Sequence, residues 1–320
     1  MKKILIKALL ILCLGTVLTG CANTEEQKEN KQVENNVEED KKVANGKIFD
    51  ELTKVLESNN AIEAKKFILD NIEKVDQKTA DKMVMKYEGL LRKNFYMLSE
   101  KFSSTEYFVA INKAIDENHK LNLELIKDKN IKKEAMDAVA SGHTFEMLEG
   151  DYYLTMDDSM IYDTFSSYLS ENLKSYYKLK KKELENPTFI EESIGIDFKE
   201  IKDRAVALEK FIRDNKDFEN KETLESMMKM YVEALLRIDY FSNTVDYETG
   251  KVDEVVKKTY EELKSSDFKI LKYVSEEMDT LLSEYKYVVK ATNQEATQKI
   301  NELRFKLSDE VAQKIEEYYY

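Results

Sequence analysis

Two short blocks of one pattern place a carboxylate and a guanidinium four residues apart. They are Glu88-Gly89-Leu90-Leu91-Arg92 and Glu233-Ala234-Leu235-Leu236-Arg237. Residues at this spacing are neighbours on one helix face, so each block can form a Glu–Arg pair. Arginine can bind a carboxylate or phosphate through two parallel hydrogen bonds, which makes both pairs candidate ligand-binding residues. The alternative, which we favour, is a partly buried pair that clamps adjacent helices.

The chain has two histidines, His119 and His143, and neither has a partner at the spacing of a metal site. The Gly-x-Ser-x-Gly motif of a nucleophile elbow is also absent from the sequence. His143 follows Gly142 in a segment that breaks the helical pattern, so we expect it to be the more exposed histidine and name it as a candidate ligand-binding residue. We therefore predict no catalytic residues, no metal ligands and no cofactor.

Acidic and tyrosine clusters have simpler structural explanations. Four aspartates lie near that same segment, but they lack the alternation of a calcium-binding EF-hand loop; Asp157 or Asp158 instead predicts the cap of a following helix. The tyrosine pairs could form a recognition surface. Because most of them recur at the spacing of the apolar helix faces, they are better explained as core residues, as for Tyr176-Tyr177. The clustered aspartates are Asp151, Asp157, Asp158 and Asp163.

The composition predicts an all-α fold. From residue 47 onward apolar residues recur at three- and four-residue spacings, the period of a helix. The chain has one proline and eight glycines, so few residues interrupt helices. We expect a helix starting near Asp76 or Thr79, further helices around 103–127 and 130–140, and a loop or short hairpin between Ser141 and Thr155. Pro187, with Gly195 close behind, marks the clearest internal boundary.

The second half of the chain echoes the first. Lys66 to Asn71 returns 144 residues later as Lys210 to Asn215, and the Glu–Arg block returns at an offset of 145. A weaker echo pairs Leu169-Ser170-Glu171 with Leu307-Ser308-Asp309. We predict two tandem, internally duplicated helical bundles, over residues 47–186 and 187–320. The alternative is coincidence between helices rich in lysine, glutamate and leucine.

The first residues have the three parts of a secretory signal peptide. A basic start precedes an apolar run that is too short to cross a bilayer, and small residues then lead to Leu18-Thr19-Gly20-Cys21. This ending resembles the lipobox of bacterial lipoproteins. The resemblance implies cleavage after Gly20, a thioether-linked diacylglycerol on Cys21, and fatty acyl chains such as palmitate as the anchor. Alternatives are a signal peptide cut elsewhere or an N-terminal anchor helix.

The net charge of the chain argues against some classes of binding partner. Removal of residues 1–20 takes away three lysines and no acid, so the formal net charge changes from −13 to −16. Such a surface repels nucleic acid and anionic lipid, which leaves the acyl chains to hold the protein at the membrane. Residues 21–46 are too polar to form a core, and we expect a disordered acidic tether.

These features favour a non-enzymatic binding or scaffold protein, lipid-anchored on the extracytoplasmic face of the cell membrane. A groove between or within the repeats would hold a peptide, polymer or protein partner. A hydrolase of cell-wall or peptide material, with acid/base carboxylates near residues 142–158, is the second possibility. A structural envelope spacer is the third.

Overall fold

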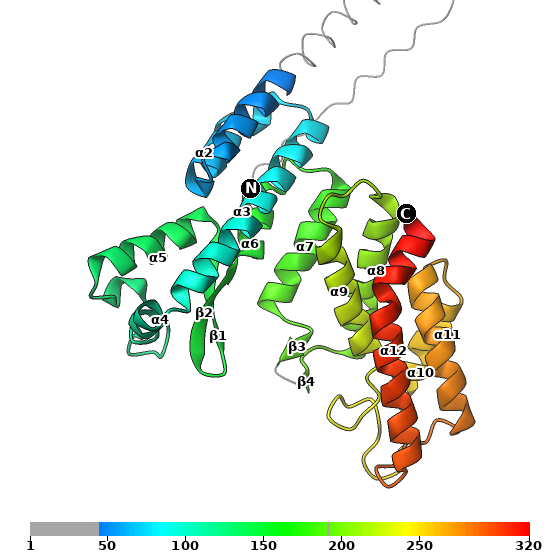
Figure 1. The fold of residues 1–320 in the computed structure, drawn as a ribbon. Helices are drawn as coiled ribbons and strands as arrows, with labels where there is room; N and C mark the ends of the chain where they lie inside the picture. The colour runs from blue at the N-terminus through cyan, green and yellow to red at the C-terminus, as the bar shows by residue number, and fades with distance from the viewer. Residues whose placement is uncertain (1–44, 191–192) are drawn as a thin grey trace, which may run out of the picture.

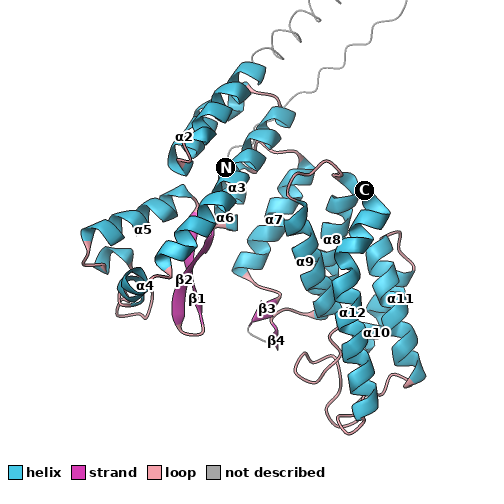
Figure 2. Cartoon of the chain, viewed as in Figure 1, coloured by secondary structure: helices cyan, strands magenta, loops and turns pink. Residues whose placement is uncertain are grey.

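The computed structural model describes residues 45–190 and 193–320, and the chain is all-α with two small two-stranded sheets (Figures 1 and 2). The signal peptide expected at 1–20, the lipidation site Cys21 and residues 22–44 of the expected tether lie outside the described residues. The last two residues of that tether, Asn45 and Gly46, are helical instead, and the Asn45 side chain is hydrogen-bonded to Asp76. Within the described ranges, no helix combines the length and apolar character needed to cross a membrane.

The first half of the described chain forms helices around one β-hairpin. Residues 45–57 are helical, and two short 3-10 turns, Ile72–Lys74 and Leu123–Leu125, join longer elements. The elements in chain order are α2 (Ala61–Asn71), α3 (Gln77–Phe102), α4 (Thr105–Asn112), α5 (Lys129–Ser141), β1 (His143–Leu148), β2 (Asp151–Met156), α6 (Asp158–Phe165) and α7 (Glu171–Glu185).

The second half begins with a minimal hairpin of β3 (Phe189–Ile190) and β4 (Ser193–Ile194). Five helices follow and pack together as a bundle, as Figure 1 shows. They are α8 (Phe198–Asp214), α9 (Lys221–Leu235), α10 (Glu254–Lys264), α11 (Lys269–Glu284) and α12 (Gln294–Tyr319).

One continuous hydrophobic core runs through both halves, from Leu52 to Tyr319. Tyr176 and Tyr177 are among its most deeply buried side chains, as the helical spacing of the tyrosines predicts. A second, smaller core joins α4, α5 and the β1–β2 hairpin around Phe102 and Phe145. Because the main core includes residues on both sides of Pro187, the two halves pack as one body.

Local sequence signals explain where several helices begin. Asp76 caps α3 by accepting a hydrogen bond from the backbone N–H of Thr79 at 2.7 Å, as predicted. Asp157 caps α6 through the N–H of Met160 at 3.0 Å, which confirms the capping role expected there. The hairpin expected after Ser141 is also present, with β1 and β2 paired in antiparallel register.

The helix expected around 103–127 is shorter than predicted. It is α4 alone, followed by a turn built on Asp116. One carboxylate oxygen of Asp116 accepts from the backbone N–H groups of Asn118 at 2.8 Å and Lys120 at 2.9 Å. Such side-chain bonds to the backbone compete with helical hydrogen bonds, and His119 takes a left-handed φ of 59° in the same turn.

The internal duplication remains a prediction. Its two stronger echoes fall at comparable places, in α2 and α8 and then in α3 and α9. However, α3 has 26 residues whereas α9 has 15, so the second copy of the Glu–Arg block reaches the end of its helix. The weaker echo falls on different structures, since Ser170 caps α7 while Ser308 lies within α12.

Candidate functional site

Glu88 lies at the centre of a buried cluster of charges between α3 and α7. Its side chain is 2% exposed, and Lys180 on α7, which is 5% exposed, donates to Glu88 Oε1 at 2.7 Å. The Tyr177 hydroxyl donates to Oε2 at 2.9 Å, and Tyr176 makes a longer contact of 3.3 Å to Oε1. Lys180 also lies 2.7 Å from Asp158 Oδ1 at the start of α6. We call Glu88, Lys180 and Asp158 the buried charge cluster.

Burial and ion pairing oppose one another in this cluster. Burial alone would raise the pKa of Glu88, but the charges of Lys180 and Arg92 and the Tyr177 hydroxyl hold that pKa below its usual range. Burial would likewise lower the pKa of Lys180, yet the negative charges of Glu88 and Asp158 raise it. At Asp158 burial prevails, and the pKa of this carboxyl is raised. The Glu88–Lys180 pair is therefore charged at neutral pH.

Arg92 connects the buried charge cluster to α9. The expected Glu88–Arg92 contact is present, with Arg92 Nη2 at 3.2 Å from Glu88 Oε1. With the Asn220 amide turned so that its oxygen faces Arg92, this oxygen accepts from Arg92 Nη2 at 2.6 Å and from Nε at 3.2 Å. Asn220 is the residue that precedes α9. The first Glu–Arg pair thus holds α3 against α7 and α9, as its structural explanation requires.

A cleft lies beside this pair, between α3 and the turn that joins α8 to α9. Its main part has a volume of about 590 Å³, and a smaller adjoining branch of about 200 Å³ is lined by Glu88, Gly89 and Arg92. Met85 and Phe218 line both parts. We call this the seam cleft, because it separates helices from the two halves of the chain.

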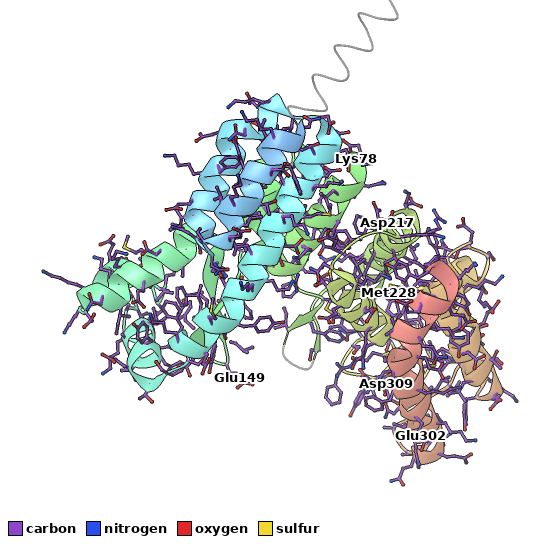
Figure 3. All side chains as sticks on the ribbon, turned by 45° about the horizontal axis from the view of Figure 1, so that its top comes forward. Lys78, Glu149, Asp217, Met228, Glu302 and Asp309 are labelled. Carbon is purple, nitrogen blue, oxygen red and sulfur yellow. The ribbon has the colours of Figure 1, made fainter. Side chains whose placement is uncertain are left out.

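The two walls of the seam cleft differ in charge. Lys78, Lys82 and Lys86 follow one another at four-residue spacing along α3, so they share one face of that helix, which also presents Asp81 to the cleft. The opposite wall carries Asp214, Asp217 and Glu219, together with Lys216. Figure 3 labels Lys78 and Asp217, one on each wall. One ion pair crosses the cleft, from Lys86 Nζ to Glu219 Oε2 at 2.7 Å.

The second predicted pair, Glu233–Arg237, does not form. Because α9 ends at Leu235, Arg237 lies beyond the helix and cannot face Glu233 one turn below. Its Nε instead pairs with Asp239 Oδ2 at 2.9 Å. Glu233 has no hydrogen-bond or ion-pair partner among the described residues. Both residues nevertheless line one pocket of about 630 Å³ with Arg304 of α12 and Phe189 of β3.

His143 is not exposed, contrary to the expectation from its glycine-containing segment. It is 0% exposed at the start of β1, with Nδ1 at 3.0 Å from the Ser141 hydroxyl and Nε2 at 3.3 Å from the Leu91 carbonyl. Burial lowers the pKa of His143. The β1–β2 hairpin packs against α3, which the local sequence could not indicate. The His143 side chain is therefore part of the packed interior and is not accessible to a ligand.

Three buried polar residues in helices were missed by the sequence analysis. Lys180 follows Leu173, Tyr176 and Tyr177 at the spacing of the apolar face of α7, and this spacing could have identified it. Arg204 is 3% exposed and pairs with Glu183 and Glu200. Glu209 is 0% exposed and accepts from the N–H groups of Ile270 at 2.8 Å and Leu271 at 3.0 Å, at the start of α11. All three residues lie on the buried face of their helix, and a charged residue in such an apolar face is the sequence pattern that could have identified them.

Comparisons with protein-family models, with curated proteins and with solved structures found no match. Over residues 45–190 and 193–320, no group of three or more histidine, cysteine, aspartate or glutamate side chains is placed to hold a metal ion. The arguments for function therefore rest on the geometry of the seam cleft and of the pocket at Arg237.

Proposed function

We propose that the protein is a lipid-anchored binding module on the extracytoplasmic face of the cell membrane, and that its seam cleft holds a peptide, polymer or protein partner. The observation that carries the proposal is the cleft itself, whose lining combines a mostly basic wall, a mostly acidic wall and the apolar side chains of Met85 and Phe218. Peptides offer charges of both signs and apolar groups, and so match both walls. The lipobox-like Leu18 to Cys21 supports the anchor.

Gly89 supports a binding role for the smaller branch of the seam cleft. It lies inside α3, where glycine destabilises a helix by roughly 0.5–1 kcal/mol relative to alanine. A Cβ atom added to Gly89 would meet no atom within 4 Å other than those of its chain neighbours and of the nearby backbone of α3, so packing does not require the glycine. The absent side chain leaves the branch of the cleft open beside Glu88 and Arg92.

Site-specific photo-crosslinking in intact cells tests the cleft. A photoreactive amino acid at Lys82 is expected to capture a defined partner, whereas one at Glu149, in the exposed β1–β2 turn labelled in Figure 3, should not. Gly89→Leu is expected to abolish capture without lowering the melting temperature, because the added side chain fills the smaller branch. Equal capture at both positions, or capture that Gly89→Leu leaves unchanged, would overturn the proposal.

Fractionation of cells tests the anchor separately. Cys21→Ser is expected to move the protein from the membrane fraction to the soluble fraction, since acyl chains contribute about 0.8 kcal/mol per buried CH₂ to membrane binding. Lys133→Ser, on the exposed face of α5, is the control and should leave the protein membrane-bound. A Cys21→Ser protein that stays membrane-bound would contradict lipid anchoring but not binding in the cleft.

A second candidate function is hydrolysis of cell-wall or peptide material, and it is supported by carboxyl groups at the hairpin. The Glu146 side chain is exposed on β1. Partial desolvation of its carboxyl group and the negative charges of Asp157 and Asp158 raise the pKa of Glu146, and a carboxyl group with a raised pKa can act as a general acid. Turnover of a peptidoglycan or peptide substrate that Glu146→Gln abolishes, with the fold intact, would favour this function over binding alone.

A further inference from the structure

The pocket that contains Glu233 and Arg237 is built from three separate parts of the chain. Ser226, Lys229, Met230 and Glu233 line it from α9, and their spacing places all four on one face of that helix. Arg304 approaches from α12, while Arg237 and Phe189 close the end of the pocket beyond Leu235. We call this the arginine pocket; it is separate from the seam cleft, with which it shares no lining residue.

Arg304 differs from the other arginines of the protein in its ion pairing. Of the five arginines in the chain, four pair with carboxylates, namely Arg92, Arg204, Arg213 and Arg237. Arg304 has no carboxylate partner within the described residues, and its buried Nε has no hydrogen-bond partner. A guanidinium offers five N–H donors, and leaving a buried donor unsatisfied is costly. In a protein with a net charge of −13, an arginine without a carboxylate is unexpected unless something else pairs with it.

Arg237 adds a second set of donors at the same pocket. Its Nε is used by Asp239, which leaves the terminal Nη groups without a carboxylate. The guanidinium carbon of Arg237 lies 5.9 Å from the centre of the Phe189 ring, so one ligand in the pocket can contact both the cation and the ring. Met230 adds a second apolar surface on the α9 side.

We propose that the arginine pocket binds an organic oxyanion: a carboxylate or phosphate held by Arg237 and Arg304, on an apolar group that contacts Phe189 and Met230. Two guanidinium groups suit an oxyanion because their planar donors can form charge-assisted, bidentate hydrogen bonds. Glu233 places one negative charge in the same pocket and opposes the binding of an anion. The inference is independent of the seam cleft and of the anchor.

Selective ¹⁵N labelling of arginine gives a direct test on the full chain, because all five arginines lie in the described part and three of them lie outside the pocket. The probes are 3-phenylpropionate, phenyl phosphate, inorganic phosphate and the neutral 3-phenylpropanol. Saturable shifts of the Arg237 and Arg304 Nε–H signals are expected with the two aromatic anions, while the Arg204 and Arg213 signals stay in place. Whichever aromatic anion binds more tightly identifies carboxylate or phosphate as the preferred group.

Variants separate binding from folding. Arg304→Gln and Arg237→Gln are each expected to weaken binding at least about tenfold, the effect of losing one charge-assisted hydrogen bond. Arg213→Gln, which removes a surface arginine on α8, is the matched control and should bind normally. Glu233→Gln should tighten binding, because it removes the opposing charge; a purely structural role of the pocket would not produce this gain. Arg304→Lys keeps the charge and tests the bidentate geometry if Arg304→Gln fails to fold.

Three results would overturn the proposal. The first is the absence of saturable shifts with either aromatic anion, and the second is an equal response to 3-phenylpropanol. The third is binding of inorganic phosphate as tight as that of phenyl phosphate, which would remove the role assigned to Phe189 and Met230.

Discussion

Removal of the Lys180 charge is expected to destabilise the protein strongly. In Lys180→Met the side chain keeps its apolar stem but loses the ammonium group, which lies 2.7 Å from both Glu88 Oε1 and Asp158 Oδ1. Loss of one partner from a buried ion pair typically costs about 3–5 kcal/mol, because the remaining charge is left in a poorly solvated place. Glu88 keeps Arg92 and Tyr177, so we expect a loss near the lower value, about 3 kcal/mol. Against a typical total of about 5–15 kcal/mol, this is a large fraction of the stability.

A matched surface pair gives the control. Lys133 and Asp137 on α5 are separated by 2.6 Å, nearly the same distance, but their side chains are 75% and 48% exposed. Exposed pairs of this kind contribute about 0.3–0.5 kcal/mol, so Lys133→Met should have little effect. Urea denaturation followed by far-UV circular dichroism measures both variants. The reasoning is refuted if Lys180→Met costs no more than Lys133→Met.

The same variant has a diagnostic pH dependence. Without Lys180, Glu88 and Asp158 lose their shared cation, and their pKa values in the folded protein should rise above those in the unfolded chain. The folded state then binds more protons than the unfolded state, so stability falls as pH rises through the acid range. The deficit of Lys180→Met relative to wild type should therefore shrink toward low pH. A deficit that is constant with pH would show that lost packing, rather than a buried charge left without its partner, explains the effect.

Three further predictions concern single residues. Glu209→Ala should lower the free energy of unfolding by about 2–4 kcal/mol, because two backbone N–H groups of α11 lose their buried acceptor. Burial raises the pKa of Glu209, so the wild type should lose stability as pH rises through the acid range, and Glu209→Gln should lose less. Urea titrations at several pH values measure both effects. His143 has a lowered pKa, so the wild type should lose stability as pH falls below about 6.5, and His143→Gln should reduce this acid dependence in the same titrations. Gly89→Ala should raise the free energy of unfolding by about 0.5–1 kcal/mol, and an unchanged or lower melting temperature would contradict the open space at that position.

The features predicted correctly depend on neighbours in the sequence. Asp76 and Asp157 cap helices because their side chains reach N–H groups three residues ahead, and these contacts are set by local chain geometry. Tyr176 and Tyr177 are buried because they continue the apolar face of their own helix. The all-α class follows from the same periodicity, repeated along the chain.

The features that were missed depend on contacts between distant segments. Lys180 pairs with Glu88 across 92 residues of sequence, and no local pattern connects the two. His143 is buried because β1 packs on the Leu91 carbonyl of α3, whereas its glycine neighbour suggests an exposed loop. The Glu233–Arg237 pair does not form because α9 ends at Leu235, and the residue at which a helix ends is difficult to predict from sequence.

The end of α9 also explains why two similar sequence blocks have such different surroundings. In the first block α3 continues for ten residues beyond Arg92, so the arginine stays on the helix face and helps Lys180 neutralise Glu88. In the second block the helix stops before Arg237, which turns away to Asp239 and leaves Glu233 half-buried without a partner among the described residues. Full burial of an ionised Glu233 would require donors such as Lys180 and Tyr177, which pair with Glu88. The neighbouring helix α12 instead supplies Arg304, which lines the same pocket without pairing with Glu233. The same residue types therefore form a closed structural clamp where the helix continues, and an open, cation-rich pocket where it ends.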